Sequence, residues 1–564
     1  MRAFLLALIG AIILAVFAVT PPRPTGRNPA TTTFSAERAM DDVRRIANRP
    51  HPTGSPENAA VRAYIAARMQ ALGMEVSTSE GIIGDRALAR INTWSGRSDT
   101  AMPLINVIGV LPGRDRSLPA LLLMSHHDTV WGSPGAPDDT AGVAASLEVV
   151  RAVKAKGQTE RDIIVLVTDA EELGLEGAKH FFAQHQLRSR IGTIINMEAR
   201  GGGGRAWLFQ TSRENGAAIG FYSRSVARPA ASSLAAYVYS VLPNDTDLTP
   251  ALKGPFSAYN FAFIGRSGLY HSPLATPDRL DQGSLQDMGQ QVLSLSDALA
   301  NSRVLPAKAP DVVFFELFGL LTLTWPAWLG WPMLALAALA IGLAVRRDGR
   351  ADLVQGAVRM VGLVVASGLS LYAFNRLSTM GGRTEYYDRL AAIPRLEVMA
   401  ALVCAASFLL LFGPGKASPG RSAGAALPLL LLAIAAQVLA PTAAYILVAP
   451  VLLMALVLYW PNRWAQLAVA LVVTAFVGSL AHFLMQGVGT TMPMAAALPL
   501  ALAVLALLPL WPGLAQAKAR AAIITLLVAA GGVALWVLLD APAETRAVYA
   551  DDKGFVKIPP KRDL

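Results

Sequence analysis

The chain has 564 residues and a formal net charge of +10, and 53% of its residues are hydrophobic. The positive charge does not indicate nucleic-acid binding, because much of it lies in short segments between long apolar runs, where it fits the orientation signal of a membrane protein. The single cysteine, Cys404, excludes an intramolecular disulfide and a zinc site built on cysteines. These features predict a membrane-anchored protein with one soluble globular domain.

An apolar run covers residues 3–19 and follows Arg2 directly. Because no small-x-small cleavage site separates this run from the prolines at 21–24, the sequence predicts an uncleaved signal anchor over residues 1–20. Residues 21–35 are rich in Pro and Thr and are predicted to be a linker. The soluble domain that follows is expected over residues 36–305.

Short apolar runs alternate with helical patterns in this soluble part. Helices are predicted after Ser35 and after Ser55, because serine is a favoured N-cap residue. Further helices are expected over 141–155, 174–185 and 283–300, and strands over 104–111, 118–125, 163–167 and 191–195. Residues 201–204 are four glycines, which indicate a loop with close backbone approach or mobility. The pattern predicts an α/β fold whose mixed, largely parallel sheet is flanked by helices.

Acidic residues and histidines follow these apolar runs in clusters. The clusters are Ser125-His126-His127-Asp128, Asp138-Asp139, Glu171-Glu172, Asn196-Met197-Glu198 and Tyr270-His271. Because open α/β sheets bind ligands at the carboxyl ends of their strands, we expect these clusters to meet in one site. Each cluster alone is a common surface or turn pattern, but all five in this order favour a functional site.

The residue types suit a pair of zinc ions, which need imidazole and carboxylate ligands and one shared carboxylate. His126 and His271 can supply one imidazole to each ion, and Asp138 can bridge the two. Glu172 and Glu198 can each complete the ligands of one ion.

Three further residues have a predicted place near this site. Glu171 can act as the general base, because it is adjacent to a ligand without being one. Asp128 is two residues from His126, so both lie on one face of a strand, and Asp128 can orient the imidazole. His127 should face the other side of that strand, and His51, between two prolines, is expected to be a structural turn residue.

These motifs resemble the zinc-dependent aminopeptidases and carboxypeptidases with a co-catalytic dizinc site, over roughly residues 36–300. Their order is His-x-Asp, Gly-Ala-x-Asp-Asp-x-x-Gly, Glu-Glu-x-Gly, Asn-x-Glu and Tyr-His-Ser. Within these zinc exopeptidases the chain is similar to the membrane branch of the endoplasmic-reticulum metallopeptidase and the fungal vacuolar membrane protease. Residues 50–55 and the motif Asp245-Thr246-Asp247 also resemble that branch, without a chemical step assigned to them.

The resemblance implies two zinc ions and a division of the ligands between them. His126, Asp138 and Glu198 would bind one ion, while Asp138, Glu172 and His271 would bind the other. Many soluble members have Asp at the position of Glu198, so full occupancy of that ion's site is the less secure part of this expectation.

The C-terminal half is dominated by runs of Leu, Ala and Val. A juxtamembrane segment is predicted over 306–327, with an interfacial helix at 312–325. A transmembrane domain of about eight helices follows over 328–540, and residues 541–564 form a tail. The spans are expected at about 328–345, 352–374, 396–413, 424–441, 443–460, 465–486, 491–511 and 521–540.

Charge predicts the orientation of these spans. The loops that carry Arg346, Arg347, Lys416, Arg463 and Lys518 would lie inside, by the positive-inside rule, although the outer loop 375–395 also carries arginines. The soluble domain would then lie on the non-cytoplasmic side. The Ala- and Arg-rich composition favours a bacterial inner membrane, with this domain in the periplasm.

Together these observations predict a membrane-anchored zinc exopeptidase, most simply an aminopeptidase, with a peptide substrate, a lipid environment and no nucleic-acid partner. It would hydrolyse peptide bonds with a zinc-activated water and Glu171 as general base. One alternative is an enzyme like glutaminyl cyclase with a single zinc. A second is a receptor that keeps the peptidase fold without activity, and a third is a transporter regulated by the outer domain.

Overall fold

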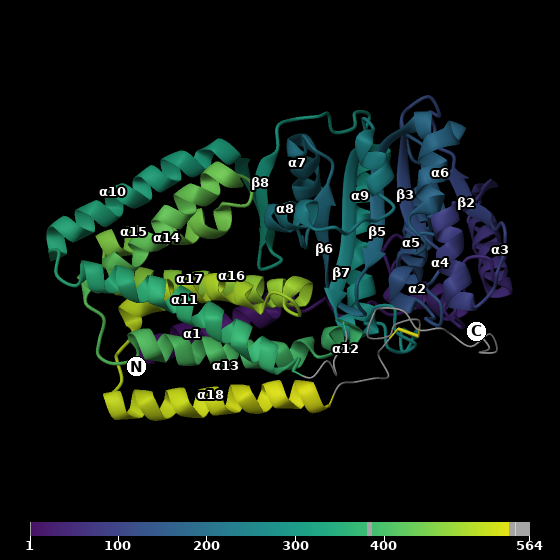
Figure 1. Cartoon of the computed structure of the whole chain (residues 1–564). Helices are drawn as coiled ribbons and strands as arrows, with labels where there is room; N and C mark the ends of the chain where they lie inside the picture. The colour runs from purple at the N-terminus through teal and green to yellow at the C-terminus, as the bar shows by residue number, and fades with distance from the viewer. Residues whose placement is uncertain (1, 381–385, 541–546, 549–564) are drawn as a thin grey trace. The chain divides into compact units, whose positions relative to one another are not determined.

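Seven strands form one mixed sheet in the N-terminal half of the chain, whose computed structural model describes residues 2–380, 386–540 and 547–548. The strands are β1 (Glu75–Ile82), β2 (Pro103–Leu111), β3 (Ala120–His126), β4 (Ile163–Thr168), β5 (Ile191–Ala199), β6 (Gly203–Thr211) and β7 (Ser257–Gly265), in the order β1-β2-β4-β3-β5-β7-β6. The four central strands run parallel, and the outer pairings are antiparallel. The predicted sheet is confirmed (Figure 1).

Both faces of the central strands are buried. Along β3, the side chains of Leu121 and Leu123 alternate with those of Leu122 and Met124, and all four have no solvent exposure. Leu122 and Met124 belong to one apolar cluster with Phe181. A continuous apolar strand of this kind is the pattern of a parallel sheet covered on both sides, which explains why the apolar runs could be identified in the sequence.

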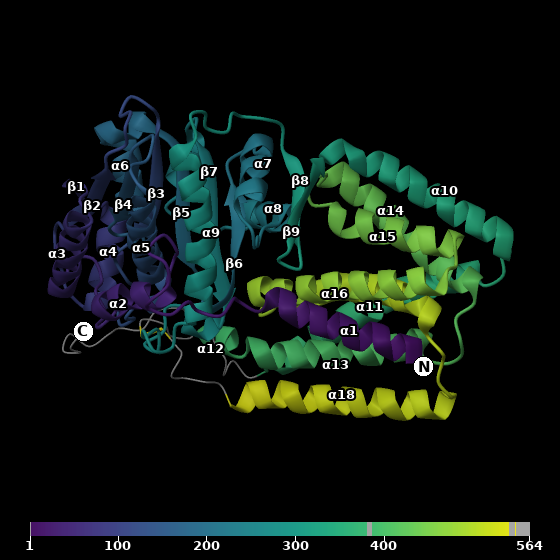
Figure 2. The same ribbon diagram turned by 180° about the vertical axis from the view of Figure 1, so that it is seen from behind.

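Helices connect these strands and cover the sheet (Figures 1 and 2). They are α2 (Ala36–Ile46), α3 (Pro56–Ala71), α4 (Asp85–Ser95), α5 (Ala141–Lys156), α6 (Glu176–Gln184), α7 (Gly216–Ser225), α8 (Ser233–Val241) and α9 (Gln282–Asn301). The two predicted serine caps are present, because the hydroxyls of Ser35 and Ser55 accept hydrogen bonds from the first turns of α2 and α3.

The four glycines at 201–204 are not a flexible loop. Gly203 and Gly204 begin β6, and a Cβ atom on Gly201 would lie 2.3 Å from the carbonyl oxygen of Gly265. Close backbone approach therefore explains the glycines, because a larger residue at 201 would collide with the neighbouring strand.

The second half of the chain is a bundle of apolar helices. These helices, together with one at the N-terminus, are α1 (Arg2–Val19), α10 (Gly330–Asp348), α11 (Leu353–Leu377), α13 (Ile393–Phe412), α14 (Pro419–Leu439), α15 (Tyr445–Tyr459), α16 (Arg463–Val488), α17 (Ala497–Leu507) and α18 (Gln516–Leu539). Among the described residues, eight helical segments are long and apolar enough to cross a membrane. The span expected at 443–460 is the shorter helix α15, which follows a turn at Pro441 and stops before Pro461.

The expectation of an interfacial helix at 312–325 is wrong. This segment forms a two-stranded sheet of β8 (Val312–Leu317) and β9 (Leu321–Pro326). Phe318 and Gly319 between the strands have φ values of +55° and +68°, which reverse the chain. A short run of Val, Phe, Leu and Thr suits either structure by periodicity alone, so the sequence pattern was ambiguous.

Two compact units divide the chain. One is built mainly from Pro21–Asp311, and the other mainly from Met1–Thr20, Val312–Gly319 and Leu323–Ala541. The predicted tail 541–564 lies outside the described residues, apart from Ala547 and Val548. The domain boundaries at residues 20, 35, 305 and 327 stay predictions.

Candidate metal centre

The carboxyl ends of the parallel strands bring the predicted residues together. His126 is the last residue of β3, Glu198 lies one residue before the end of β5, and Glu171 follows the end of β4 by three residues. Asp138 lies in the short turn Ala136–Thr140 between β3 and α5, where its backbone angles are not helical. Adjacent parallel strands end at one edge of the sheet, and this edge is where open α/β sheets bind ligands.

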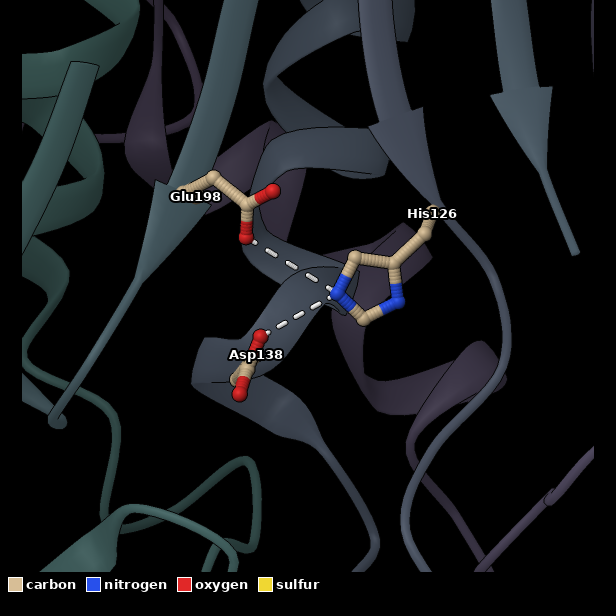
Figure 3. A group of neighbouring side chains, drawn as sticks. All are labelled: His126, Asp138 and Glu198. Carbon is tan, nitrogen blue, oxygen red and sulfur yellow. Dashed lines mark hydrogen bonds and ion pairs between the residues drawn. The ribbon is translucent and has the colours of Figure 1, made fainter. Parts of the chain in front are cut away.

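A first cluster consists of His126, Asp138 and Glu198 (Figure 3). The Nε2 atom of His126 lies 3.2 Å from Oδ1 of Asp138 and 3.9 Å from Oε2 of Glu198. The side chains are 1%, 10% and 9% exposed. One imidazole nitrogen and two carboxylates that converge in a nearly buried place have the donor chemistry of a zinc site.

A second cluster shares Asp138 with the first and adds Glu172 and His271. The Nε2 atom of His271 lies 3.1 Å from Oε2 of Glu172 and 3.6 Å from Oδ2 of Asp138. Each oxygen of Asp138 therefore faces a different imidazole, His126 on one side and His271 on the other. This is the arrangement required of a carboxylate that bridges two cations.

Asp128 holds the polypeptide around both clusters. Its carboxylate accepts hydrogen bonds from the backbone N–H groups of Glu171 (2.9 Å) and Glu172 (3.2 Å). Its backbone carbonyl lies 2.9 Å from Nδ1 of His126, on the ring nitrogen opposite the cluster. A partner on that nitrogen fixes the orientation of an imidazole ligand.

Glu171 lies beside the clusters, within a third group formed with His126 and Glu172. Burial raises the pKa of Glu171 well above its usual range, against the attraction of His126, and the carboxylates of Glu198 and Glu172 add to the rise. Burial raises the pKa of Glu198 and Glu172 too. A buried group of carboxylates that repel one another needs positive charge, so the residues fit a metal cation.

Asp139 shapes the turn that carries Asp138. Its buried carboxylate accepts hydrogen bonds from the backbone N–H groups of His126 (3.2 Å) and Gly142 (3.1 Å). A Cβ atom on Gly142 would lie 2.5 Å from both carboxylate oxygens. Gly142 is therefore required because the Asp139 carboxylate lies too close for a larger residue. Asp139 itself holds the backbone of the turn through its hydrogen bonds.

Asp247 is a site residue to which the sequence assigned no role. It has no solvent exposure, and one of its carboxylate oxygens accepts a hydrogen bond from the Thr168 hydroxyl at the end of β4. Burial raises the pKa of Asp247 to about 7, against the attraction of His126. The motif Asp245-Thr246-Asp247 was the available signal, but it does not reveal which residues surround it.

Two other histidines lie outside the three groups. His127 faces Asn58, with 3.1 Å between its Nδ1 and the amide nitrogen, and its Nε2 lies 3.1 Å from the carbonyl of Ile105. His51 is buried, with Nδ1 at 2.8 Å from the carbonyl of Arg49. Burial lowers the pKa of both rings, to about 4 for His51. Neither ring belongs to a group of described residues that could hold a metal ion.

The model of Peptidase family M28 matches residues 106–296 of this chain. Endoplasmic reticulum metallopeptidase 1 of Mus musculus is 30% identical over 341 residues, which cover 58% of this chain and 38% of that protein. The vacuolar membrane protease of Schizosaccharomyces pombe is 31% identical over 293 residues, or 50% of this chain and 34% of that protein. The chain thus matches little more than a third of the length of these relatives.

Solved structures that are similar to part of this chain include an aminopeptidase and a glutaminyl cyclase. A zinc aminopeptidase from Bacillus subtilis has a TM-score of 0.39 and 15% identity, and the match covers 50% of this chain and 99% of that one. A glutaminyl cyclase from Porphyromonas gingivalis has a TM-score of 0.37 and 19% identity, with coverage of 47% and 98%.

Proposed function

We propose that the chain is a membrane-anchored, zinc-dependent exopeptidase and most simply an aminopeptidase, because residues 106–296 match the model of Peptidase family M28. One observation carries the proposal. Asp138 directs one carboxylate oxygen toward His126 and the other toward His271, which provides two adjacent cation sites with one shared ligand. The relatives named endoplasmic reticulum metallopeptidase 1 and vacuolar membrane protease support it.

The residues divide between two ions as follows. His126, Asp138 and Glu198 would hold one zinc, and Asp138, Glu172 and His271 would hold the other. Zinc bound there supplies a Lewis acid that polarises the scissile carbonyl and lowers the pKa of water.

Glu171 performs the proton transfers in this proposal. It takes a proton from the attacking water and later gives it to the departing amine, so that the carboxylate is regenerated at the end of the cycle. Burial raises the pKa of Glu171, and zinc bound beside it would lower this pKa again, so that the ionised carboxylate is available to accept a proton. The Asp128 carboxylate accepts a hydrogen bond from the backbone N–H of Glu171, and the Asp128 backbone carbonyl lies against Nδ1 of His126.

A free amino terminus is the substrate group that suits this site. Burial raises the pKa of three carboxylates at this site, Glu171, Glu198 and Asp247, and Asp247 adds to the rise at both glutamates. A protonated α-amino group placed there would offset this negative charge, whereas a blocked amino terminus would bring no charge. The charge of the site thus favours cleavage at the amino end of a peptide.

The test uses the full-length chain in detergent, loaded with zinc. Peptides with free and with acetylated amino termini are compared, for the wild type, Glu171→Gln, and the surface control Glu160→Gln. We expect cleavage of free amino termini only, at least about a hundredfold slower with Glu171→Gln while zinc stays bound, and unchanged with Glu160→Gln.

A zinc-loaded, folded protein that leaves every peptide intact would contradict the proposal. Cyclisation of peptides that begin with glutamine, without hydrolysis, would show a cyclase instead. Binding of peptides without either reaction would show a receptor with a peptidase fold.

A further inference from the structure

A partly open cavity of about 310 Å³ lies among α13, α16 and α17 of the helical unit. Its lining is mostly small or apolar, and includes Ala400 and Cys404 of α13, Val477 and Ala481 of α16, and Ala503 of α17. None of its lining residues belongs to the groups that could hold a metal ion. The volume reaches the range of roughly 300–1,000 Å³ that small-molecule sites occupy.

One end of this cavity carries an ionisable pair. Oε1 of Glu397 lies 2.8 Å from Nδ1 of His482 and accepts a hydrogen bond from the side-chain amide of Gln486 (3.1 Å). Glu397 and His482 line the cavity, and both keep partial exposure, 24% and 39% of the side chain. Ionisable side chains in apolar spans are costly and commonly mark binding sites or transport pathways.

The pair lies near one end of the helix bundle. Glu397 is four residues after the start of α13 at Ile393, and His482 is six residues before the end of α16 at Val488. At 1.5 Å per residue these positions are about 6 and 9 Å from the helix ends. Thr474, eight residues earlier in α16, lines the cavity about 12 Å deeper.

A structural ion pair between α13 and α16 would not by itself require this space. Here mostly small residues leave an apolar pocket beside the pair, lined as deep as Thr474 and Ala503. The pocket therefore has a polar end near the ends of α13 and α16 and an apolar part further along these helices.

We propose that this cavity binds a membrane lipid, with one acyl chain in the apolar part and an ammonium headgroup at Glu397. Glu397 places a carboxylate at this end of the pocket, 2.8 Å from Nδ1 of His482. A carboxylate there favours a headgroup that carries an ammonium group over one that carries only negative charge. The inference goes beyond the proposed peptidase and does not depend on catalysis.

The test places the full-length protein in nanodiscs that contain a low mole fraction of a photoactivatable lipid. The probe is phosphatidylethanolamine with a diazirine in one acyl chain, compared with phosphatidylglycerol that carries the same chain. We expect the ethanolamine probe to label α13, α16 and α17 at the cavity. Ala481→Phe, which fills the cavity, should abolish this labelling, and Ala468→Phe, on the exposed part of the same helix, should not.

A second variant tests recognition of the headgroup without changing the volume of the cavity. Glu397→Gln keeps the shape of the side chain, and we expect about tenfold weaker labelling by the ethanolamine lipid, because a hydrogen bond to a charged group is lost. Equal labelling by both lipids would overturn the ammonium assignment. Equal labelling of the wild type and Ala481→Phe would show ordinary annular lipid and overturn the site. Neither result depends on whether the soluble unit cleaves peptides.

Discussion

Asp128 connects a metal ligand to the general base proposed for the reaction. Its carboxylate accepts hydrogen bonds from the backbone N–H groups of both Glu171 and Glu172. Its backbone carbonyl lies against the ring of His126. A neutral side chain of the same shape would keep the volume and lose the charge that makes these hydrogen bonds strong. The position of the site therefore depends on a residue that would touch neither metal nor substrate.

We expect Asp128→Asn to weaken zinc binding about 10–100-fold, because partners behind a metal ligand contribute that much to affinity. Competition with a chromophoric zinc chelator measures the change. Asp41→Asn serves as the control, since Asp41 is an exposed residue that pairs with Arg27. Unchanged zinc affinity in Asp128→Asn would show that the charge of Asp128 is not needed to hold the ligands.

Residue order and type predicted which side chains would meet, but not what each one contacts. His126, Asp138, Glu172 and Glu198 could be selected because their motifs end or follow predicted apolar strands, and His271 could be selected from its motif Tyr-His-Ser. Whether they serve as ligands is the proposal that the zinc titrations test. The roles of Asp139 and Asp247 depend on backbone amides and a hydroxyl from distant segments, and a sequence pattern does not contain those distances.

At the scale of elements, the turn before α5 is constrained by one glycine. Gly142→Ala would place a methyl group 2.5 Å from both carboxylate oxygens of Asp139. We expect a loss of about 1–3 kcal/mol in the free energy of unfolding, together with weaker zinc binding, because Asp139 also holds the backbone of His126. Urea unfolding and zinc titration measure the two effects.

The matched control for this substitution is Gly220→Ala in α7. A Cβ atom there would meet only the end of the flexible Arg224 side chain, at 3.4 Å. Alanine is the better helix former, so this variant should be neutral or more stable by up to about 1 kcal/mol. If both variants behave alike, the close approach to Asp139 is not what selects glycine at position 142.

Helices with a clear hydrophobic period and an N-cap residue could be predicted from the sequence. Elements whose conformation depends on tertiary contacts could not. The helices after Ser35 and Ser55 begin where their caps predict. Residues 312–325 form strands instead of a helix, because positive φ values at Phe318 and Gly319 reverse the chain. Strand β6 was missed, since its first residues are glycines that suggest a loop.

For the whole molecule, zinc removal and pH should act together. In the metal-free protein, burial raises the pKa of Glu171, Glu198 and Asp247, so the folded state binds more protons than the unfolded state. Its stability should therefore fall as pH rises from about 4 toward 7 and above. Chelation of zinc should lower Tm more at pH 8 than at pH 5, by calorimetry.

The reason is that protons and metal compete for the same carboxylates. When free zinc is a hundredfold above its Kd, binding stabilises the folded state by about 2.7 kcal/mol. A chelation effect on Tm that is equal at both pH values, or larger at pH 5, would contradict this account.

The charges of the loops predict the orientation of the whole molecule in the membrane. We expect Val304→Cys, at an exposed position of the soluble unit, to react with an impermeant thiol reagent on intact cells. Ala351→Cys, next to the arginines after α10, should react only after permeabilisation. Both are made in a Cys404→Ser background, whose lack of labelling is the control. The reverse pattern would place the soluble unit inside.

Asp138 has a consequence for how such an enzyme would respond to its surroundings. Two ions that share one carboxylate cannot bind independently, and each must change the affinity of the other by the same factor. Activity would then follow the filling of the weaker position rather than total zinc. A cell could therefore adjust proteolysis at this membrane through metal supply alone, without a separate regulatory subunit.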